Sequence, residues 1–199
     1  MKLLLLGMTY LVVGLGNPGK LYARTRHNAG WLILDYAYQA KWQKSKSAAA
    51  AYYQTIIASQ AVELFKPLTF MNNSGQAVSV AAKKHQILPA HIIVVHDDKD
   101  IPLGQLKIQT NRGDAGHNGV KSIIAHLKTK SFMRIRVGIK PSNDLPAGQL
   151  VLKNFSAADL KIIKALSSKV KEAIEIIISQ GLPAAMNEFN PVTTTLPTP

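Results

Sequence analysis

His27 and Asp97 each lie next to an apolar segment of the sequence, and together they could carry out acid–base chemistry. His27 closes a glycine-rich stretch, residues 14–30, and Asp97 comes just after the most strand-like run of the chain. A histidine acts as a general base near neutral pH when a carboxylate accepts its second ring proton and fixes its tautomer. We therefore predict that His27 is a catalytic base and Asp97 the acid that orients it. The neighbouring His96 and His117 we expect to have structural roles.

Asparagines in loops next to the expected strands and helices supply neutral hydrogen-bonding groups. Any single one of them could simply cap a helix or occupy a turn. As a set, beside a histidine, they also suit an enzyme that holds an ester or amide, with Phe70 and Met71 as an apolar floor. The asparagines are Asn17, Asn72, Asn73 and Asn118.

The glycine-rich stretch also matches two nucleotide-binding patterns. Residues 14–19 fit the dinucleotide fingerprint, and residues 14–20 fit the first seven positions of a P-loop. Both patterns need a helix that begins directly after the turn. Here a basic segment follows instead, Pro18 lacks an N–H group, and Leu21 stands where a magnesium-binding Ser or Thr is required. A P-loop ATPase is therefore only a third alternative, and a tight turn without a ligand fits these glycines at least as well.

The acidic run at residues 97–100 leaves a magnesium site open as an alternative. Lys99 within the run and the basic surroundings weaken this interpretation. For Asp98 and Asp100 we favour pairing with neighbouring cations. We expect no cofactor, and the magnesium site stays open as the less favoured interpretation.

Charge is the most unusual feature of the composition. The 199 residues include 24 Lys and Arg against 11 Asp and Glu, a formal net charge of +13. Such a balance favours a polyanionic partner, and nucleic acid is preferred over a membrane because no lipidation signal or strongly basic amphipathic helix is present. The absence of cysteine excludes thiol nucleophiles and disulfides and is compatible with a reducing cytoplasm. The apolar residues 3–6 are too few to cross a membrane.

Strand-like and helix-like segments alternate along the chain without an internal repeat. This pattern predicts one α/β domain, residues 8–190, with a twisted, mixed and mainly parallel sheet flanked by helices. Residues 1–7 would be an N-terminal extension and residues 191–199 a disordered tail. In such sheets the ligand site lies at the carboxyl ends of the strands. We expect strands at 12–13, 52–58, 62–66, 92–95, 105–109, 132–139 and 150–152, and helices at 28–41, capped by Asn28, and at 74–87, 120–128 and 156–180.

Basic residues in several elements could together hold a polyanion through many modest phosphate contacts. Arg134 and Arg136 alternate along the strand 132–139, which places both on one face. No aromatic stacking motif or helix-turn-helix is evident, so we expect binding by backbone and shape rather than by base sequence. The other candidate cations are Arg24, Arg26, Lys107, Lys121 and Lys128.

Six motifs in register resemble those of the bacterial-type peptidyl-tRNA hydrolases, from about Tyr10 to Asn190. The motifs are residues 13–19 (VGLGNPG), 25–30 (TRHNAG), 66–72 (KPLTFMN), 96–104 (HDDKDIPLG), 116–119 (GHNG) and 134–139 (RIRVGI). The resemblance implies cleavage of the ester between a peptide and the 3′ end of its tRNA by a cytoplasmic, monomeric, metal-independent enzyme.

The resemblance also implies a role for individual residues. His27 would activate the water, and Asp97 would orient His27. Lys107 and Arg136, with Arg134 nearby, would hold tRNA phosphate. The substrate-binding residues would be Asn17, Tyr22, Met71, Asn72 and Asn118.

Three positions depart from the pattern of this family. Ala115 stands where a glycine is usual and could restrict the loop that carries Asn118, while Leu68 and Lys99 also differ from the usual residues. The main alternative from another class is an RNA-binding protein without activity that keeps the fold and the basic face. Incubation with an N-acylated aminoacyl-tRNA separates the two, because a pure binder leaves the ester intact.

Overall fold

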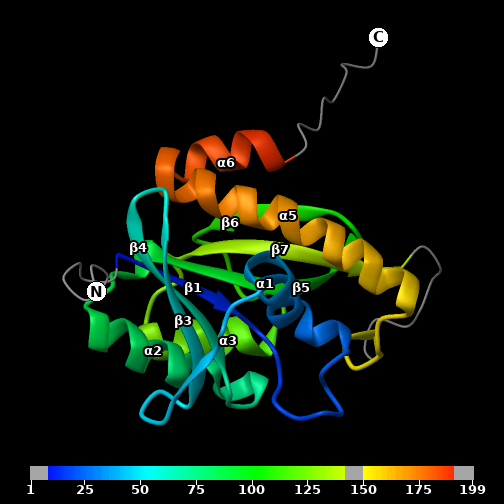
Figure 1. Cartoon of the computed structure of the whole chain (residues 1–199), viewed down its shortest axis with the longest axis horizontal. Coiled ribbons are helices and arrows are strands. Elements are labelled where there is room, and N and C mark those ends of the chain that lie inside the picture. The colour runs from blue at the N-terminus through cyan, green and yellow to red at the C-terminus, as the bar shows by residue number, and fades with distance from the viewer. Residues whose placement is uncertain (1–8, 142–149, 191–199) are drawn as a thin grey trace.

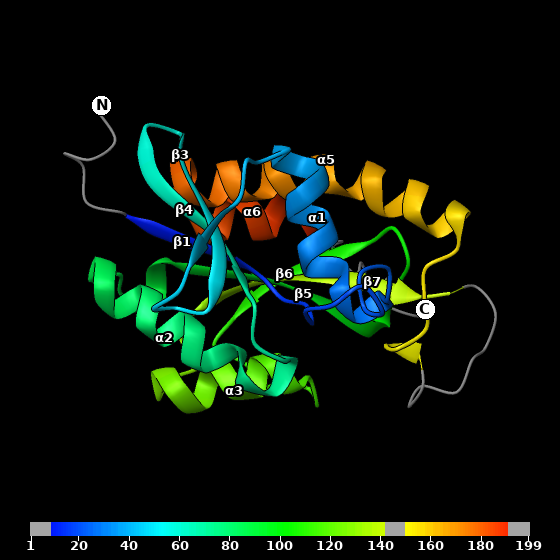
Figure 2. The same ribbon diagram turned by 60° about the horizontal axis from the view of Figure 1, so that its bottom comes forward.

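The computed structural model describes residues 9–141 and 150–190, and in it a seven-stranded sheet lies between two layers of helices (Figures 1 and 2). The strand order is β2-β3-β4-β1-β5-β7-β6. The four central strands, β4, β1, β5 and β7, run parallel, while β2, β3 and β6 pair antiparallel at the two sides. The predicted α/β fold with a mixed sheet is confirmed.

Most of the expected elements form, with ends shifted by a few residues. The strand expected at 92–95 is an exception, because it runs on to Pro102, and Asp97 lies within it rather than after it. The strands are β1 (Tyr10–Gly14), β2 (Gln43–Ser45), β3 (Ala50–Ile57), β4 (Gln60–Pro67), β5 (Ile92–Pro102), β6 (Leu106–Thr110) and β7 (Met133–Lys140). The helices are α1 (Ala29–Tyr38), α2 (Ser74–His85), α3 (Asn118–Leu127), α5 (Ala157–Gln180) and α6 (Leu182–Phe189), with short 3₁₀ helices at Arg26–Asn28, Met71–Asn73 and Pro89–His91.

Each face of the sheet has its own apolar core, and the alternation of side chains along β1 shows why. Val12 packs on the side of α1, α5 and α6, whereas Leu11 and Val13 pack on the side of α2 and α3. A strand that is covered on both faces reads as a continuous apolar run, because neither face meets water. The two views show these layers on opposite sides of the sheet (Figures 1 and 2).

Several expectations from the sequence differ from the structure. Leu150–Leu152 is not a strand, and the segment continues into a single bridge between Asn154 and Thr25. No strand was assigned to residues 43–50 and no helix after residue 180, but β2 and the start of β3 lie in the first stretch, with Ala50 fully buried, and α6 follows Gly181. β2 is short and largely exposed, and α6 is a short helix that packs on α5 and β6, so neither has a strong local pattern. The expected extension 1–7 and tail 191–199 lie outside the described residues.

The site region forms where β5 continues past the end of β1. The pairing of the two strands ends at Gly14 and Val95, so the second half of β5 projects beyond this edge. The first turn of α1 lies directly against the same edge. A Cβ atom at Gly30 would overlap Val95 O and would lie 2.5 Å from Leu15 N. Only glycine permits this close approach of helix and strand ends.

Replacing Gly30 with alanine should therefore destabilise the fold. The added methyl group would force α1 away from β1 and β5, and overpacking of this kind costs about 1–3 kcal/mol. Urea unfolding measures the loss. The matched control is Gly113→Ala, because a Cβ atom at Gly113 has no neighbour within 4 Å. Equal stability of the two variants would contradict the assigned contact.

Candidate active site

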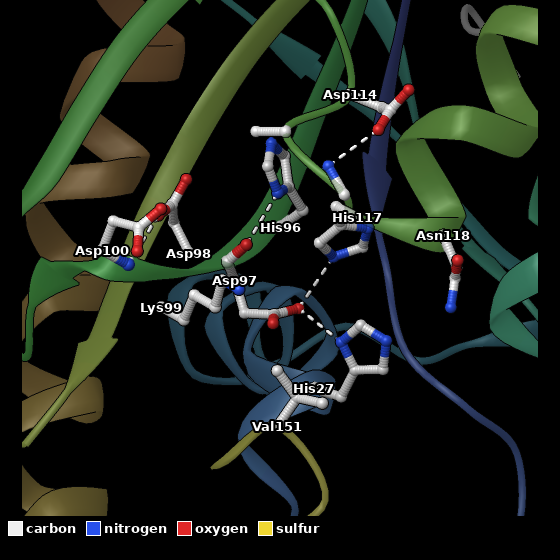
Figure 3. Close-up of a pocket in the computed structure, with 12 residues that line it drawn as sticks. His27, His96, Asp97, Asp98, Lys99, Asp100, Asp114, His117, Asn118 and Val151 are labelled. Atoms are coloured by element: carbon white, nitrogen blue, oxygen red, sulfur yellow. Dashed lines mark hydrogen bonds and ion pairs between the residues drawn. The ribbon is translucent and has the colours of Figure 1, made fainter. Parts of the chain in front are cut away.

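Asp97 is the centre of the candidate site. Its carboxylate lies on the projecting part of β5 and is only 3% exposed as a residue. The same oxygen, Oδ1, accepts a hydrogen bond from His27 Nδ1 and from His117 Nε2, each at 2.9 Å (Figure 3). Burial raises the pKa of Asp97, but the charges and hydrogen bonds of His117 and His27 outweigh it, and the pKa lies well below its usual range. Asp97 is therefore an anion at neutral pH.

His117 has a tautomer that its hydrogen bonds determine. It is the N-cap of α3, and its Nδ1 accepts from the backbone N–H groups of Gly119 and Val120. Because Nδ1 accepts, a neutral ring carries its proton on Nε2, which donates to Asp97. Both ring nitrogens of His117 are therefore engaged. The sequence analysis expected a structural role, and the structure adds a direct contact with Asp97.

In His27, unlike His117, the ring nitrogen that donates to Asp97 is Nδ1. Its backbone N–H donates to the carbonyl of Val151 at 2.8 Å, and the residue is 8% exposed. Its Nδ1–H donates to Asp97, which leaves Nε2 without a proton in the neutral ring. In Figure 3 this second nitrogen lies on the side of the pocket that carries Asn118. An unprotonated Nε2 beside a pocket can take a proton from water.

His96 lies behind His117, edge-on to its ring at 4.7 Å between centroids. Its Nδ1 is 2.8 Å from the carbonyl oxygen of Asp97, to which it donates. Burial and then the charge of His117 lower the pKa of His96 well below its ordinary value of 6.5. His96 is thus a neutral, structural histidine, as the sequence analysis expected.

The loop that carries Asn17 is held by Asn28. Asn28 Oδ1 accepts from the backbone N–H of Asn17 at 2.9 Å, and Asn28 Nδ2 donates to the Asn17 carbonyl at 3.0 Å. Asn28 was expected to cap α1, but its side chain makes no capping hydrogen bond. The side-chain oxygen of Asn17 accepts from the backbone N–H of Met71 at 2.8 Å. The remaining donor of Asn17 is its Nδ2 amide.

Of the other predicted substrate-binding residues, only Asn118 lines the same pocket as the histidines. Asn118 lines the pocket from the first position of α3, and its side chain is exposed. Met71 is buried beneath Gly119, at whose position a Cβ atom would lie 2.5 Å from Met71 Sδ. Asn72 is exposed, and Tyr22 lies edge-on to the exposed ring of Phe70, with 6.2 Å between centroids.

The predicted phosphate-binding cations fall into two groups. Lys107 is exposed on β6 and pairs across the sheet with Arg136 on β7. Arg136 Nε donates to Asp98 at 2.7 Å, and its side chain is 20% exposed. Arg134, by contrast, is 1% exposed, and its guanidinium donates to the carbonyls of Arg112 and Gly113. The structure does not support Arg134 as a phosphate contact, because it is used inside the protein to hold the loop before His117.

His27, Asp97 and His117 also form a donor set of the kind that binds zinc, since one ligand atom of each lies within 4.8 Å of the others. However, both imidazoles point at one carboxylate oxygen. Metal–nitrogen bonds of about 2.0–2.1 Å in the same directions would place an ion close to that oxygen. The arrangement therefore fits two N–H donors on one carboxylate better than a metal centre.

Ala115, the departure noted in the sequence, has a left-handed backbone with φ of 51°. Residues other than glycine pay about 1–2 kcal/mol for this conformation. The next residue, Gly116, also has a positive φ, and its N–H donates to Asp114. The backbone just before His117 and Asn118 is therefore strained at Ala115, and a glycine at position 115 would remove this strain.

The hydrogen-bonded His27–Asp97 pair beside the pocket fits hydrolysis assisted by a general base, although the fold alone does not define a function. The sequence profile described as peptidyl-tRNA hydrolase matches residues 11–197. A peptidyl-tRNA hydrolase of Chloroflexus aggregans is 40% identical to this chain, and the match covers 92% of this chain and 100% of that protein. A peptidyl-tRNA hydrolase of Mycobacterium tuberculosis is 39% identical, and the match covers 90% of this chain and 96% of that protein. The crystal structure of peptidyl-tRNA hydrolase from Acinetobacter baumannii has a TM-score of 0.80 at 31% identity and covers 93% of this chain and 96% of its own. The chain therefore belongs to the peptidyl-tRNA hydrolase family and is an enzyme of that family.

The neutral state of buried His96 predicts a pH effect on stability. As the pH falls below 6.5, the unfolded chain takes up a proton at this position and the folded protein does not. The free energy of unfolding should then fall by up to about 1.4 kcal/mol per pH unit for this one proton.

Chemical denaturation between pH 7 and pH 5 tests this expectation. In His96→Asn the amide can still donate to the Asp97 carbonyl but does not titrate, so the dependence on pH should be shallower than in the parent. Parallel pH curves for the two proteins would show that His96 is not the source.

Proposed function

We propose that this enzyme cleaves the ester between a peptide and the 3′ end of its tRNA with a water molecule activated by His27. The observation that carries the proposal is the hydrogen bond from His27 Nδ1–H to the buried Asp97 carboxylate. It leaves Nε2 as a base beside the pocket. The membership of the family supplies the substrate class.

In the proposed reaction His27 Nε2 takes a proton from water while the oxygen attacks the ester carbonyl. The tetrahedral intermediate carries its negative charge on the former carbonyl oxygen. When this intermediate collapses, the bond to the tRNA 3′ oxygen breaks, and that oxygen receives the proton held on Nε2. The products are a peptide carboxylic acid, which loses its proton to solvent, and tRNA with a free 3′ hydroxyl, and His27 is neutral again.

Asp97 would stabilise the imidazolium of His27 during this step. Its low pKa keeps it ionised, so the positive charge forms next to a fixed negative one. The second donor, His117, prevents the carboxylate from turning away from His27. The pair therefore works as a base with a fixed orientation.

Amide groups around the base are suited to bind the substrate. The Nδ2 groups of Asn17 and Asn118 are the donors we assign to the ester or the adjacent peptide carbonyls, because neutral donors stabilise a developing oxyanion. Asn72 and Tyr22 would contact the substrate at the exposed edge, and Met71 would form the apolar floor. The assignment gives each residue a role that its exposure permits.

The acceptor stem of tRNA would lie on the surface around Lys107 and Arg136. Lys107 is the stronger candidate of the two, because Arg136 already shares its charge with Asp98. We also propose that the enzyme is a cytoplasmic monomer. Within the described ranges, none of the helices has the length and apolar character needed to cross a bilayer.

Replacing His27 should abolish most of the activity. In His27→Gln the amide retains hydrogen-bonding capacity but cannot accept the proton, and loss of a general base costs about 10²- to 10⁴-fold in kcat. Release of tRNA from N-acylated aminoacyl-tRNA measures the rate. The control is His91→Gln, at a partly exposed histidine remote from Asp97. Near-full cleavage by the His27 variant would exclude this mechanism.

Replacing Lys107 should weaken tRNA binding without changing the chemical step. Loss of one phosphate contact in Lys107→Gln should raise KM and reduce the slope of log KM against log salt by about one. The control is Lys164→Gln, because Lys164 is an exposed cation of helix α5 and not of the sheet. An unchanged salt dependence in Lys107→Gln would place the phosphates elsewhere.

A further inference from the structure

Arg26 precedes the proposed catalytic base and is a charged residue in the interior. It is only 5% exposed. The sequence analysis counted it among the cations that could hold a polyanion. A guanidinium at this depth cannot meet the phosphates of a large nucleic acid, so its charge requires another explanation.

The guanidinium of Arg26 joins two distant parts of the chain. Its Nη1 donates to the carbonyl of Ile139 near the end of β7 at 3.0 Å, and its Nη2 donates to Asp159 Oδ2 in the first turn of α5 at 2.7 Å. The ring of Phe155 lies below it, 4.9 Å from the centroid to the central carbon. Arg26 is thus fixed from three sides.

Asp159 is itself held in place. Its Oδ2 also accepts from the backbone N–H of Ser156, and Ser156 Oγ accepts from the backbone N–H of Asp159. These two bonds form the capping box of α5, a helix of 24 residues that packs against α1. The partner of Arg26 therefore belongs to a rigid part of the fold.

The backbone on both sides of Arg26 is bound to the segment that leads into α5. The N–H of Arg26 donates to Lys153 O, the N–H of His27 donates to Val151 O, and Phe155 N donates to Arg24 O, at 2.8–2.9 Å. The side chain and the main chain of Arg26 thus fix the same short segment. The imidazole of His27 projects from that segment toward Asp97.

We propose that Arg26 is a positioning residue for His27, which it holds at the distance and angle that the reaction requires. The inference rests on the proposed function of His27 as the base. Arg26 itself is buried, and its guanidinium donates to Ile139 and Asp159 rather than facing the pocket. It acts by tying the 3₁₀ turn Arg26–Asn28 to the end of β7 and to the start of α5.

The proposal makes a kinetic distinction between positioning and phosphate binding. An enzyme whose base is slightly displaced still binds its substrate. The rate of the chemical step falls, however, because a misplacement of about 1 Å can cost 10²-fold. Removal of the Arg26 contacts should therefore lower kcat and leave KM and its salt dependence unchanged. A phosphate contact would have the reverse effects.

The experiment compares Arg26→Met with Lys164→Met in the full chain. Lys164 is an exposed cation of α5 and is not among the candidate phosphate contacts, so it is the control. For Arg26→Met we expect kcat to fall by about 10- to 100-fold, with unchanged KM for N-acylated aminoacyl-tRNA and unchanged affinity for deacylated tRNA. Arg26→Lys should recover part of kcat, because one ammonium group can reach Asp159 or Ile139 but cannot donate to both in the same fork geometry.

A second variant and a spectroscopic readout cover the case in which Arg26→Met does not fold. Asp159→Asn keeps an oxygen for the capping box but removes the charge that faces Arg26, and kcat should again fall with KM unchanged. The NMR signal of the His27 Nδ1 proton, which reports the hydrogen bond to Asp97, should shift in both variants and not in Lys164→Met.

The outcomes separate the two hypotheses. A folded Arg26→Met or Asp159→Asn protein with parental kcat and an unshifted His27 signal overturns the positioning role. A raised KM with a weaker salt dependence and unchanged kcat also overturns it, in favour of phosphate binding. If His27→Gln cleaves the ester normally, the proposed mechanism fails, whereas a shifted Nδ1 signal would still show that Arg26 positions His27.

Discussion

The rest of the site depends on one buried carboxylate that accepts two N–H groups. An isolated anion at the depth of Asp97 would be costly, because burial strongly disfavours a charge that lacks partners. The donors from His27 and His117 reverse this balance and keep the group ionised. Each donor bond also fixes the orientation of a ring. The two histidines, which are 90 residues apart in the chain, are therefore oriented by a single oxygen atom.

The fold supplies the positions from which these rings approach. β5 runs on beyond the end of β1 and brings Asp97 to the edge of the sheet, while α1 and α3 begin on either side of it. Gly30 lets the chain after His27 lie directly against the strand ends. His117 holds the first turn of α3 through the nitrogen that does not contact Asp97. Cap, helix and carboxylate are thus parts of one hydrogen-bonded unit.

The sequence predicted the elements that local patterns encode. The apolar runs of β1 and β5 and the capping box of α5 are visible in adjacent residues. His27 and Asp97 were also selected from local patterns, although Asp97 lies within β5 and His27 in the 3₁₀ turn before α1 rather than at strand ends. The double role of His117 could have been suspected from a histidine that directly precedes a helix, but its contact with Asp97 depends on tertiary structure. The burial of Arg26 and Arg134 was also missed. Their partners are backbone carbonyls and an aspartate in other elements, up to 133 residues away, and charge alone does not distinguish such an arginine from a surface one.

The hydrogen bonds between Asn28 and the main chain of Asn17 fix the backbone of the loop that carries Asn17 without using the Asn17 side chain. They use only the peptide N–H and C=O of position 17, which every residue except proline provides in full. A change of side chain at position 17 would leave these two bonds in place, but it would remove the acceptor of the buried Met71 N–H. At position 28 the side-chain amide must both donate and accept, so a change there would release the backbone of the loop itself. A change at position 17 therefore alters the substrate contacts and the link to Met71, whereas a change at position 28 alters the path of the loop.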